Sequence, residues 1–262
     1  MKIPYYHIDA FTGTLFKGNP AGVCLLESWP DDALLQAIAR ENNLSETAFL
    51  VGDKNEYELR WFTPTVEVDL CGHATLAAGF VLSTLLQVTD KPLLFHSQSG
   101  TLQVDREKEL LYLNFPSRHP APLPCPDLLT NALKTTPLAT YASRDLLAVF
   151  EKEEDILALQ PDFNLLSQLN YLGCIVTAPG VTADFSSRFF APSVGINEDP
   201  VTGSAHCTLI PYWADRLQKN TLKAHQVSKR GGELLCHNEG DRVRIGGQAT
   251  LYMTGTLHLS DL

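Results

Sequence analysis

The chain has 262 residues, of which 44% are hydrophobic and 19% charged, a balance typical of globular proteins rather than of disordered chains. Its formal net charge of -10 repels phosphate backbones and anionic lipid surfaces, and no run of Lys or Arg reverses this locally, so nucleic acid and membranes are excluded as expected partners. The length predicts two lobes, each with its own core.

No export signal or membrane segment is expected. The N-terminus runs directly into a strand pattern, without the apolar core of a signal peptide. The longest apolar stretch, 70–86, is interrupted by His73, Thr75, Ser83 and Thr84 and is too short and polar for a membrane span. The six cysteines are scattered without CxxC pairs, which predicts free thiols. We therefore expect a soluble, cytoplasmic protein.

The first half of the chain predicts an alternation of strands and helices. The hydrophobic pattern and the turn residues indicate strands at 3–9 and 21–26, a helix at 31–43, strands at 48–51 and 57–62, a helix at 74–86, and strands at 93–97, 102–104 and 110–115. Glu46 lies in the short polar link that precedes the strand at 48–51. The helix at 74–86 is apolar nearly all round, which is typical of a helix wrapped by other structure.

A proline-rich stretch separates the two predicted lobes. Residues 118–126 contain four prolines, which is the composition of a linker. We therefore place an N-terminal lobe at 1–117 and a C-terminal lobe at 118–262, with the option that the last strand packs back on the first lobe.

The second half of the sequence repeats the first. Residues 60–66 match 188–194 at an offset of 188 - 60 = 128, after which Val68 pairs with Ile196. Beyond a small insertion, 72–74 match 203–205 at 203 - 72 = 131, and each triplet opens an apolar helix. Apolar positions within 100–113 then match positions within 232–245 at 232 - 100 = 132.

Three matched blocks in the same order make chance the weaker explanation, and they predict a duplicated lobe. The fold class is therefore α+β, with two pseudo-symmetric lobes, each a curved, mostly antiparallel sheet around a central helix. The two central helices are expected at 74–86 and 205–217.

The turns at 71–74 and 202–205 occupy equivalent positions in the two copies, so pseudo-symmetry predicts that they face each other across an interlobe cleft. Each turn opens a helix, whose unpaired backbone N–H groups and positive dipole end attract an anion. The predicted ligand is a small organic acid. The alternative is that Gly72 and Gly203 only permit tight turns into buried helices.

Several ionisable side chains lie near these turns, and position alone does not select one of them. They are Glu46, Glu67, Asp69, His73, Glu198, Asp199 and His206. His73 and Asp199 are favoured because each lies beside a helix N-terminus, although Asp199 before Pro200 can simply shape the turn. The sequence lacks HExxH, GxSxG, GxGxxG and GxxxxGK motifs and ligand pairs with zinc spacing, so we expect no metal and no cofactor.

Six sequence blocks, in order from end to end, resemble the phenazine-biosynthesis F-like (PhzF-like) isomerase family. They are DAFT at 9–12, FKGNPAGV at 16–23, NLSETAF at 43–49, FTPTVEV at 62–68, LCGHATLA at 70–77 and DPVTGSAH at 199–206. The stretches at 60–62 and 230–234 are also similar to the animal phenazine biosynthesis-like domain-containing proteins.

The resemblance implies the fold of diaminopimelate epimerase, commonly as a homodimer, and an isomerase that needs neither metal nor cofactor. The family's acid/base glutamate matches Glu46, and its substrate-contacting histidine and aspartate match His73 and Asp199. Groups that hold the substrate match Gly72, Gly203 and Ser204, and the two turns add Ala74 and Thr202 as substrate-binding positions. In the phenazine enzyme the glutamate moves a proton between ring carbons of a dihydro-hydroxyanthranilate; here family membership implies only a small carboxylate-bearing substrate.

Two other functions remain open on the sequence. The first is a cofactor-free amino-acid racemase or epimerase that uses two thiols, for which Cys71 supplies one, while the matching position in the second copy is Thr202. The second is a non-enzymatic binding or scaffold protein that has kept the fold. Intact Glu46, His73 and Asp199 favour the enzyme.

Overall fold

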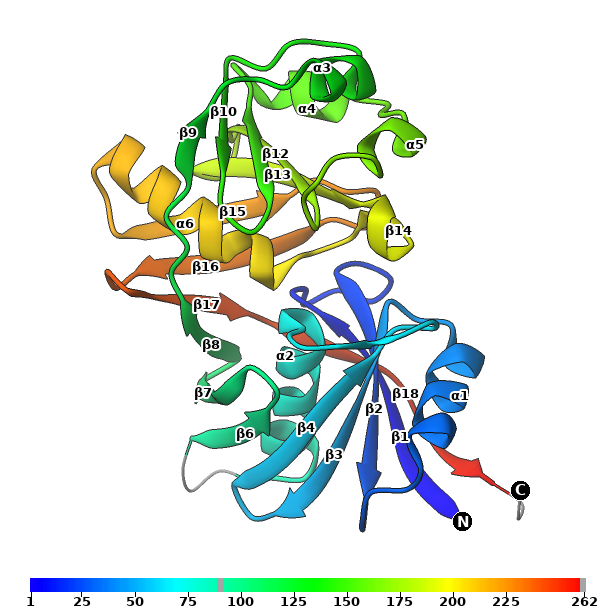
Figure 1. Ribbon diagram of the computed structural model, residues 1–262. Helices are drawn as coiled ribbons and strands as arrows, with labels where there is room; N and C mark the ends of the chain where they lie inside the picture. Colours follow the sequence, from blue (N-terminus) through cyan, green and yellow to red (C-terminus); the bar gives the residue numbers. More distant parts are fainter. Residues whose placement is uncertain (89–91, 260–262) are drawn as a thin grey trace. The chain divides into compact units, whose positions relative to one another are not determined.

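The computed structural model describes residues 1–88 and 92–259, which form two compact units (Figure 1). The first unit contains 1–114 together with the C-terminal stretch from Gly246, and the second contains Phe115–Ile245. The boundary placed after residue 117 from the sequence lies near the first crossing between the units, and the second crossing, at Gly246, corresponds to the option that the last strand packs back on the first lobe. The chain returns to the first unit at Gly246 because its last strand pairs antiparallel with its first.

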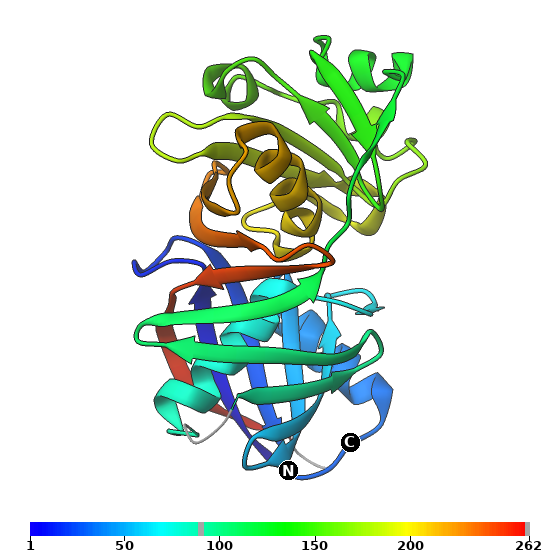
Figure 2. The ribbon, with the colours of Figure 1, turned by 90° about the vertical axis from the view of Figure 1, so that its left-hand side faces the viewer.

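The first unit is a sheet wrapped around one helix. Its strands are β1 (Lys2–Ala10), β2 (Asn19–Leu26), β3 (Glu46–Asp53), β4 (Glu56–Phe62), β5 (Glu67–Val68), β6 (Leu93–Ser97), β7 (Gly100–Glu107), β8 (Leu110–Pro116) and β18 (Ala249–His258). Its helices are α1 (Asp32–Asn42) and α2 (Gly72–Phe80), and α2 continues as a π-helical turn at Val81–Leu85. Figures 1 and 2 show these strands curving around α2.

The second unit repeats this plan with more helices. Its strands are β9 (Ala121–Leu123), β10 (Ala139–Ala142), β11 (Leu146–Val149), β12 (Cys174–Pro179), β13 (Phe185–Ala191), β14 (Ile196–Asp199), β15 (Thr221–Gln226), β16 (Gly232–Asn238) and β17 (Arg242–Gly247). Its helices are α3 (Asp127–Leu133), α4 (Glu153–Leu157), α5 (Phe163–Leu166) and α6 (Gly203–Leu217), with a 3₁₀ turn at Pro192–Val194. No element at 127–179 was predicted from the sequence.

The two helices of the first unit show why its sequence folds locally in this way. The carboxylate of Asp31 caps α1 by accepting the Ala33 N–H at 2.9 Å, and Asn43 ends the helix in the left-handed region at φ 49. Only one side of α1 is apolar, and it packs Leu35 and Ile38 on the sheet. By contrast, α2 has no polar face and is buried all round. It can therefore fold only inside the sheet.

Strand pairing has the same pattern in both units. Most pairs are antiparallel, and each unit has two parallel pairs that flank a helix: β2–β3 and β4–β6 in the first unit, β11–β12 and β13–β15 in the second. The helix between β4 and β6 is α2, and the helix between β13 and β15 is α6. The α+β class with a mostly antiparallel sheet around a central helix is thus confirmed.

The register corrects one detail of the predicted repeat. In the first unit Trp61 pairs with Val68, and in the second Phe189, the match of Trp61, pairs with Asp199. Val68 therefore corresponds to Asp199, at 199 - 68 = 131, and not to Ile196. The insertion lies before β14, where the 3₁₀ turn at Pro192–Val194 lengthens the loop.

Three predicted elements differ in extent from those of the structure. The central helix predicted at 74–86 begins at Gly72 and leaves α-helical geometry after Phe80. The partner helix predicted at 205–217 begins at Gly203. The proline-rich stretch 118–126 is not only a linker, because β9 within it pairs with β10.

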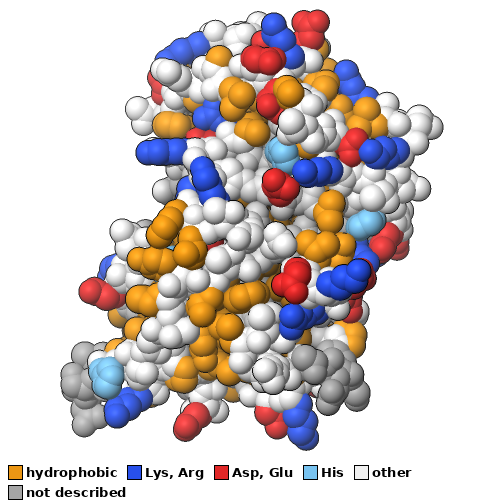
Figure 3. Space-filling view, turned by 180° about the vertical axis from the view of Figure 1, so that it is seen from behind, with side chains coloured by type: hydrophobic (Ala, Val, Ile, Leu, Met, Phe, Trp, Pro, Cys, Tyr) orange, Lys and Arg blue, Asp and Glu red, His pale blue; other side chains and the backbone are white. Residues whose placement is uncertain are grey.

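Apolar side chains also reach the surface of the first unit. Figure 3 shows them gathered over this unit on the face seen from behind. The exposed side chains include Phe16 and Tyr252, whose rings meet edge to face with centroids 5.8 Å apart. Of the helices in the described residues, none has the length and hydropathy needed to cross a membrane.

Candidate active site

Glu46 is the first residue of β3 and is buried, with 8% of its surface exposed. Parallel pairing with β2 places it beside Ala21, at the end of the strand next to the start of α2. Glu46 is therefore buried, although it lies in a polar link of the sequence. A buried carboxylate costs free energy unless other groups compensate it, so its neighbours decide what it can do.

His73, in the first turn of α2, is an ion-pair partner of Glu46. Its Nε2 lies 3.1 Å from Oε2 of Glu46, and both side chains are almost fully buried. The amide of Asn19, the first residue of β2, donates to Nδ1 of His73 at 3.0 Å. In the neutral ring, an accepting Nδ1 leaves the proton on Nε2, directed toward Glu46; in the protonated ring Nδ1 also carries a proton, which the amide oxygen of Asn19 can accept after rotation of the amide.

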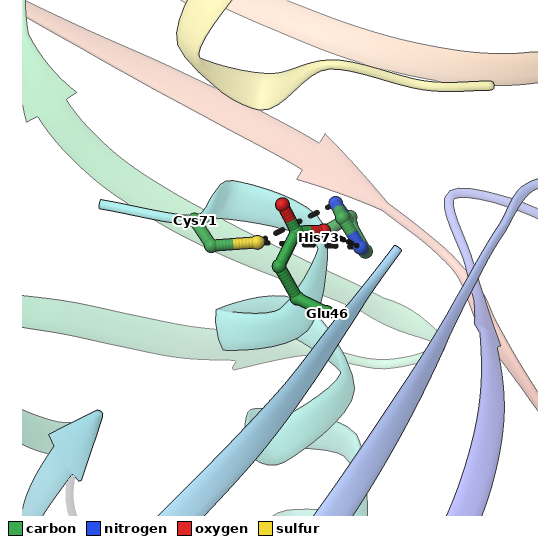
Figure 4. Close-up of side chains that lie close together, drawn as sticks. All are labelled: Glu46, Cys71 and His73. Carbon is green, nitrogen blue, oxygen red and sulfur yellow. Dashed lines mark hydrogen bonds and ion pairs between the residues drawn. The ribbon is translucent and has the colours of Figure 1, made fainter. Parts of the chain in front are cut away.

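The thiol of Cys71 completes this cluster. Its Sγ lies 3.5 Å from Nδ1 and 4.0 Å from Nε2 of His73, and Figure 4 shows the three side chains directed toward one another. One ligand atom from each of Glu46, Cys71 and His73 lies within 4.8 Å of the other two. The search for zinc spacing along the chain missed this group because Glu46 comes from a different element.

Electrostatics link these three groups. Burial alone would lower the pKa of His73, but the charges and hydrogen bonds of Cys71 and Glu46 raise it well above the ordinary value. Burial, aided by the Glu46 charge, raises the pKa of the Cys71 thiol to about 11. Since the thiol keeps its proton at neutral pH, the Glu46 carboxylate is the group that favours a protonated His73 there.

In the second unit, Asp199 ends β14 and is held by a buried hydrogen-bond network. The hydroxyl of Thr202 donates to Oδ2 of Asp199 at 2.5 Å, and the backbone N–H of Thr202 donates to Oε1 of Gln226 at 2.8 Å. The amide of Gln226 donates to the carbonyl of Asp199 at 2.8 Å and to Oγ1 of Thr202 at 3.1 Å. The turn before α6 is thus fixed by Gln226 from β15.

The predicted substrate-binding residues lie at the beginnings of the two central helices. Gly72 opens α2 and Gly203 opens α6, and the residue before each helix, Cys71 or Thr202, is extended and gives no side-chain cap. Ala74 is buried, and Ser204 is partly exposed. The first N–H groups of α2 and α6 therefore have no side-chain cap, as an anion site requires.

Neither Gly72 nor Gly203 has a positive φ. A left-handed turn is therefore not the reason for glycine at these positions. The predicted convergence of the two turns on one cleft stays a prediction.

The other ionisable candidates have structural partners. The guanidinium of Arg60 binds Glu67 through two hydrogen bonds of 2.7 Å, and Arg188 binds Glu198 through bonds of 2.8 and 3.0 Å. His206 contacts the Thr202 carbonyl at 2.8 Å from inside α6. Asp69 is exposed. None of these four residues belongs to the Glu46–Cys71–His73 cluster.

Asn19 and Gln226 were missed as functional candidates by reasoning from the sequence. Asn19 was assigned to a loop by its Gly18-Asn19-Pro20 context, although it begins β2 and is fully buried. Gln226 lies 24 residues beyond Thr202. The block at 16–23, which resembles the family, gave a signal for Asn19, whereas no signal in the sequence pointed to Gln226.

Comparisons with known proteins agree over the whole chain. The family model for phenazine biosynthesis-like proteins (PhzC-PhzF) matches residues 8–255. A Pseudomonas aeruginosa protein named as an uncharacterized isomerase is 52% identical over 259 residues, which covers 99% of this chain and 100% of that protein. The mouse phenazine biosynthesis-like domain-containing protein 1 is 40% identical over 286 residues, covering 98% of this chain and 99% of that protein.

A solved structure gives the same result for the fold. The crystal structure of a phenazine biosynthesis protein of the PhzF family from Enterococcus faecalis has a TM-score of 0.96 and 50% identity, and it covers 99% of this chain and 100% of that chain. The fold and the family that the sequence blocks predicted are therefore both confirmed.

Proposed function

This chain belongs to the PhzC-PhzF family of phenazine biosynthesis-like proteins, and we propose that it is a cofactor-independent isomerase in which Glu46 moves a proton on a small carboxylic acid. The observation that carries the proposal is the buried pair of Glu46 and His73, 3.1 Å apart beside the N-terminus of α2. The name of the Pseudomonas aeruginosa relative, an isomerase, supports the reaction class.

The proposed reaction conserves all atoms of the substrate. The Glu46 carboxylate takes a proton from a C–H bond activated by a conjugated carboxylate, and the electron pair of that bond shifts into the substrate's π system. Protonated Glu46 then returns the proton to a different carbon, so no oxidant, reductant or second substrate is needed. As Glu46 gains and loses the proton, His73 is the side chain that adjusts to the change of charge, since its Nε2 faces the same carboxylate.

Asn19 is a positioning residue in this scheme. Its amide lies 3.0 Å from Nδ1 of His73, within hydrogen-bond distance, and this contact fixes the rotation of the ring. Asp199, held by Thr202 and Gln226, and the N–H groups at Gly72, Gly203 and Ser204, which have no side-chain cap, are proposed to bind the substrate. The cytoplasmic location and the homodimer stay predictions from the sequence.

A thiol-based racemase is the weaker alternative for two reasons. The position that matches Cys71 in the second unit is Thr202, so the second thiol is missing. Burial also raises the pKa of Cys71 to about 11, which leaves very little thiolate at neutral pH to act as a base. A scaffold protein that has lost activity would not need the buried Glu46–His73 pair, whose burial costs stability.

The test is proton exchange. The protein would be incubated in D₂O with a panel of small cyclic and amino acids, and loss of C–H signals would be followed by NMR. For a substrate found in this way, Glu46→Gln should lower exchange by about 10²- to 10⁴-fold, because the amide cannot accept the proton. The matched control is Glu41→Gln, at an exposed position near the end of α1, which should exchange normally. Normal exchange in Glu46→Gln would remove the proposal.

A further inference from the structure

Three donor atoms of different chemistry meet in the first unit: a carboxylate oxygen of Glu46, the thiol sulfur of Cys71 and an imidazole nitrogen of His73. They come from the start of β3, from the residue before α2 and from the first turn of α2. All three side chains are buried. Among residues 1–88 and 92–259, this is the one group of three such side chains with ligand atoms within 4.8 Å of one another.

The spacing of these atoms is close to that of a tetrahedral metal centre. Ligands bound to Zn²⁺ at normal bond lengths lie roughly 3.4 to 3.6 Å apart. Here Nε2 of His73 lies 3.1 Å from Oε2 of Glu46 and 4.0 Å from Sγ of Cys71. Side-chain rotations that move these atoms by a few tenths of an ångström would bring both distances into the required range.

The environment of Glu46 also suits a cation. Its Oε2 is buried, and Nε2 of His73 lies 3.1 Å away, so a cation bound by both atoms would take the place of this contact. A dication surrounded by a thiolate, a carboxylate and a neutral imidazole has no net charge, which lowers the cost of burying it. The positive end of the α2 dipole opposes a cation, and the two anionic ligands offset this effect.

The donor set determines which cation fits. Ca²⁺ and Mg²⁺ require oxygen ligands, whereas a sulfur and a nitrogen donor select Zn²⁺ and related thiophilic ions. Three protein ligands are the number found in zinc sites that keep one position open. The amide of Asn19 can rotate to accept from Nδ1–H of His73, which is the outer hydrogen bond that metal-binding histidines usually make.

We propose that Glu46, Cys71 and His73 bind one Zn²⁺ ion, and that bound Zn²⁺ inhibits the protein by occupying the Glu46 carboxylate. On binding, the Cys71 thiol and the protonated His73 ring each give up one proton to solvent, and a metal–sulfur and a metal–nitrogen bond form, with no change of oxidation state. The inhibition rests on the proposed function of Glu46, whereas the binding does not. Zn²⁺ is thus inferred to be an inhibitor and not a cofactor.

The experiment is a titration of the reduced, purified protein with CoCl₂, followed by competition with ZnCl₂. Cobalt bound to a thiolate gives a sulfur-to-metal charge-transfer band in the near ultraviolet. We expect this band to saturate at one ion per chain and to be abolished by added Zn²⁺. Absence of the band, with no Zn²⁺ binding by calorimetry, would overturn the proposal.

Variants assign the band to the three residues. Cys71→Ser should abolish it, and Glu46→Gln should weaken cobalt binding by about 10-fold or more. Cys125→Ser is the control, because Cys125 is only partly buried and is therefore more accessible to an adventitious ion. A band that survives in Cys71→Ser, or disappears in Cys125→Ser, would contradict the assignment. Circular dichroism would verify that each variant is folded.

The outcome is distinguishable from failure of the proposed function. If cobalt binds as expected but Glu46→Gln still exchanges substrate protons, the metal site stands and the catalytic role fails. If Glu46→Gln is inactive but no cobalt binds, only the metal site fails.

Discussion

His206 in α6 occupies the position that Thr75 occupies in α2. Nδ1 of His206 lies 2.8 Å from the Thr202 carbonyl, and Oγ1 of Thr75 donates to the Cys71 carbonyl at 2.5 Å. Both side chains thus bond the carbonyl of the residue before the helix, four positions back in the chain. The equivalence at 206 - 75 = 131 matches the offset of the central helices. His206 is therefore a structural group of the helix start.

This role predicts acid sensitivity. Burial lowers the pKa of His206 to about 4, although its bond to the Thr202 carbonyl acts in the opposite direction. The unfolded chain binds a proton near pH 6.5 and the folded chain does not, so stability is complete above pH 6.5 and falls by about 3 kcal/mol as the pH drops to 4. In His206→Thr, which copies Thr75, this fall should disappear from urea unfolding curves measured between pH 4 and 7. The cavity left by the substitution lowers stability at every pH. The quantity to compare is therefore the change of the unfolding free energy with pH, and not its value at one pH.

Asp145 predicts a pH dependence of opposite sign. It is fully buried just before β11, and burial raises its pKa to about 6, against the charges of Arg144 and Arg118 and a backbone hydrogen bond of Gly173. A carboxyl with a raised folded pKa destabilises the fold as pH rises from its ordinary 3.8 to 6, by about 3 kcal/mol in total. Asp145→Asn should therefore gain stability relative to the wild type above pH 6 and show no gain at pH 4. An equal effect at both pH values would show that Asp145 does not titrate in this range.

Sequence periodicity was sufficient for the plan of the fold, because duplicated lobes repeat their strand, turn and helix signals. It gave the wrong equivalence for Val68, since an insertion in a loop carries no periodicity of its own. Only strand register decides that Val68 corresponds to Asp199. The π-helical turn after Phe80 was also missed, because its residues are as apolar as those of α2.

The site was predictable where its residues lie in a recognisable block, and not where they act from a distance. Gln226 reaches the turn at Asp199 and Thr202 from β15, and a single glutamine in a strand has no motif. The position in the second unit that matches Glu46 is Gly173, since Thr47 pairs with Phe62 and Cys174 pairs with Phe190. A Cβ at Gly173 would lie 2.2 Å from the Phe189 ring, so the second unit has no room for an equivalent carboxylate.

Gln226 should be required for an ordered Asp199 turn. Gln226→Leu keeps the approximate size but leaves the buried N–H of Thr202 and the carbonyl of Asp199 without their partner, which costs about 1–3 kcal/mol for each unsatisfied group. We expect lower stability in urea and, on an identified substrate, a rise in KM larger than the fall in kcat, as a positioning residue for substrate binding implies. Gln168→Leu, at an exposed position in the same unit, is the control and should change neither quantity. Unchanged stability in Gln226→Leu would show that the network is not needed.

Glu46 and Cys71 should respond oppositely to conservative substitution. Both lie against His73, so proximity alone does not decide which of them moves the proton. Burial raises the pKa of Cys71 to about 11, and the matching position in the second unit holds Thr202, so a two-thiol reaction on opposite faces of a substrate has no second partner. A single carboxylate can remove a proton and return it on the same face.

On an identified substrate, Cys71→Ser should therefore lose less than about 10-fold in kcat/KM, whereas Glu46→Gln should lose about 10²-fold or more. Iodoacetamide should also react slowly with Cys71, because the thiolate is the reactive form. If Cys71→Ser abolishes proton exchange while Glu46→Gln remains active, the reaction is thiol-based, and the carboxylate mechanism does not apply to this chain.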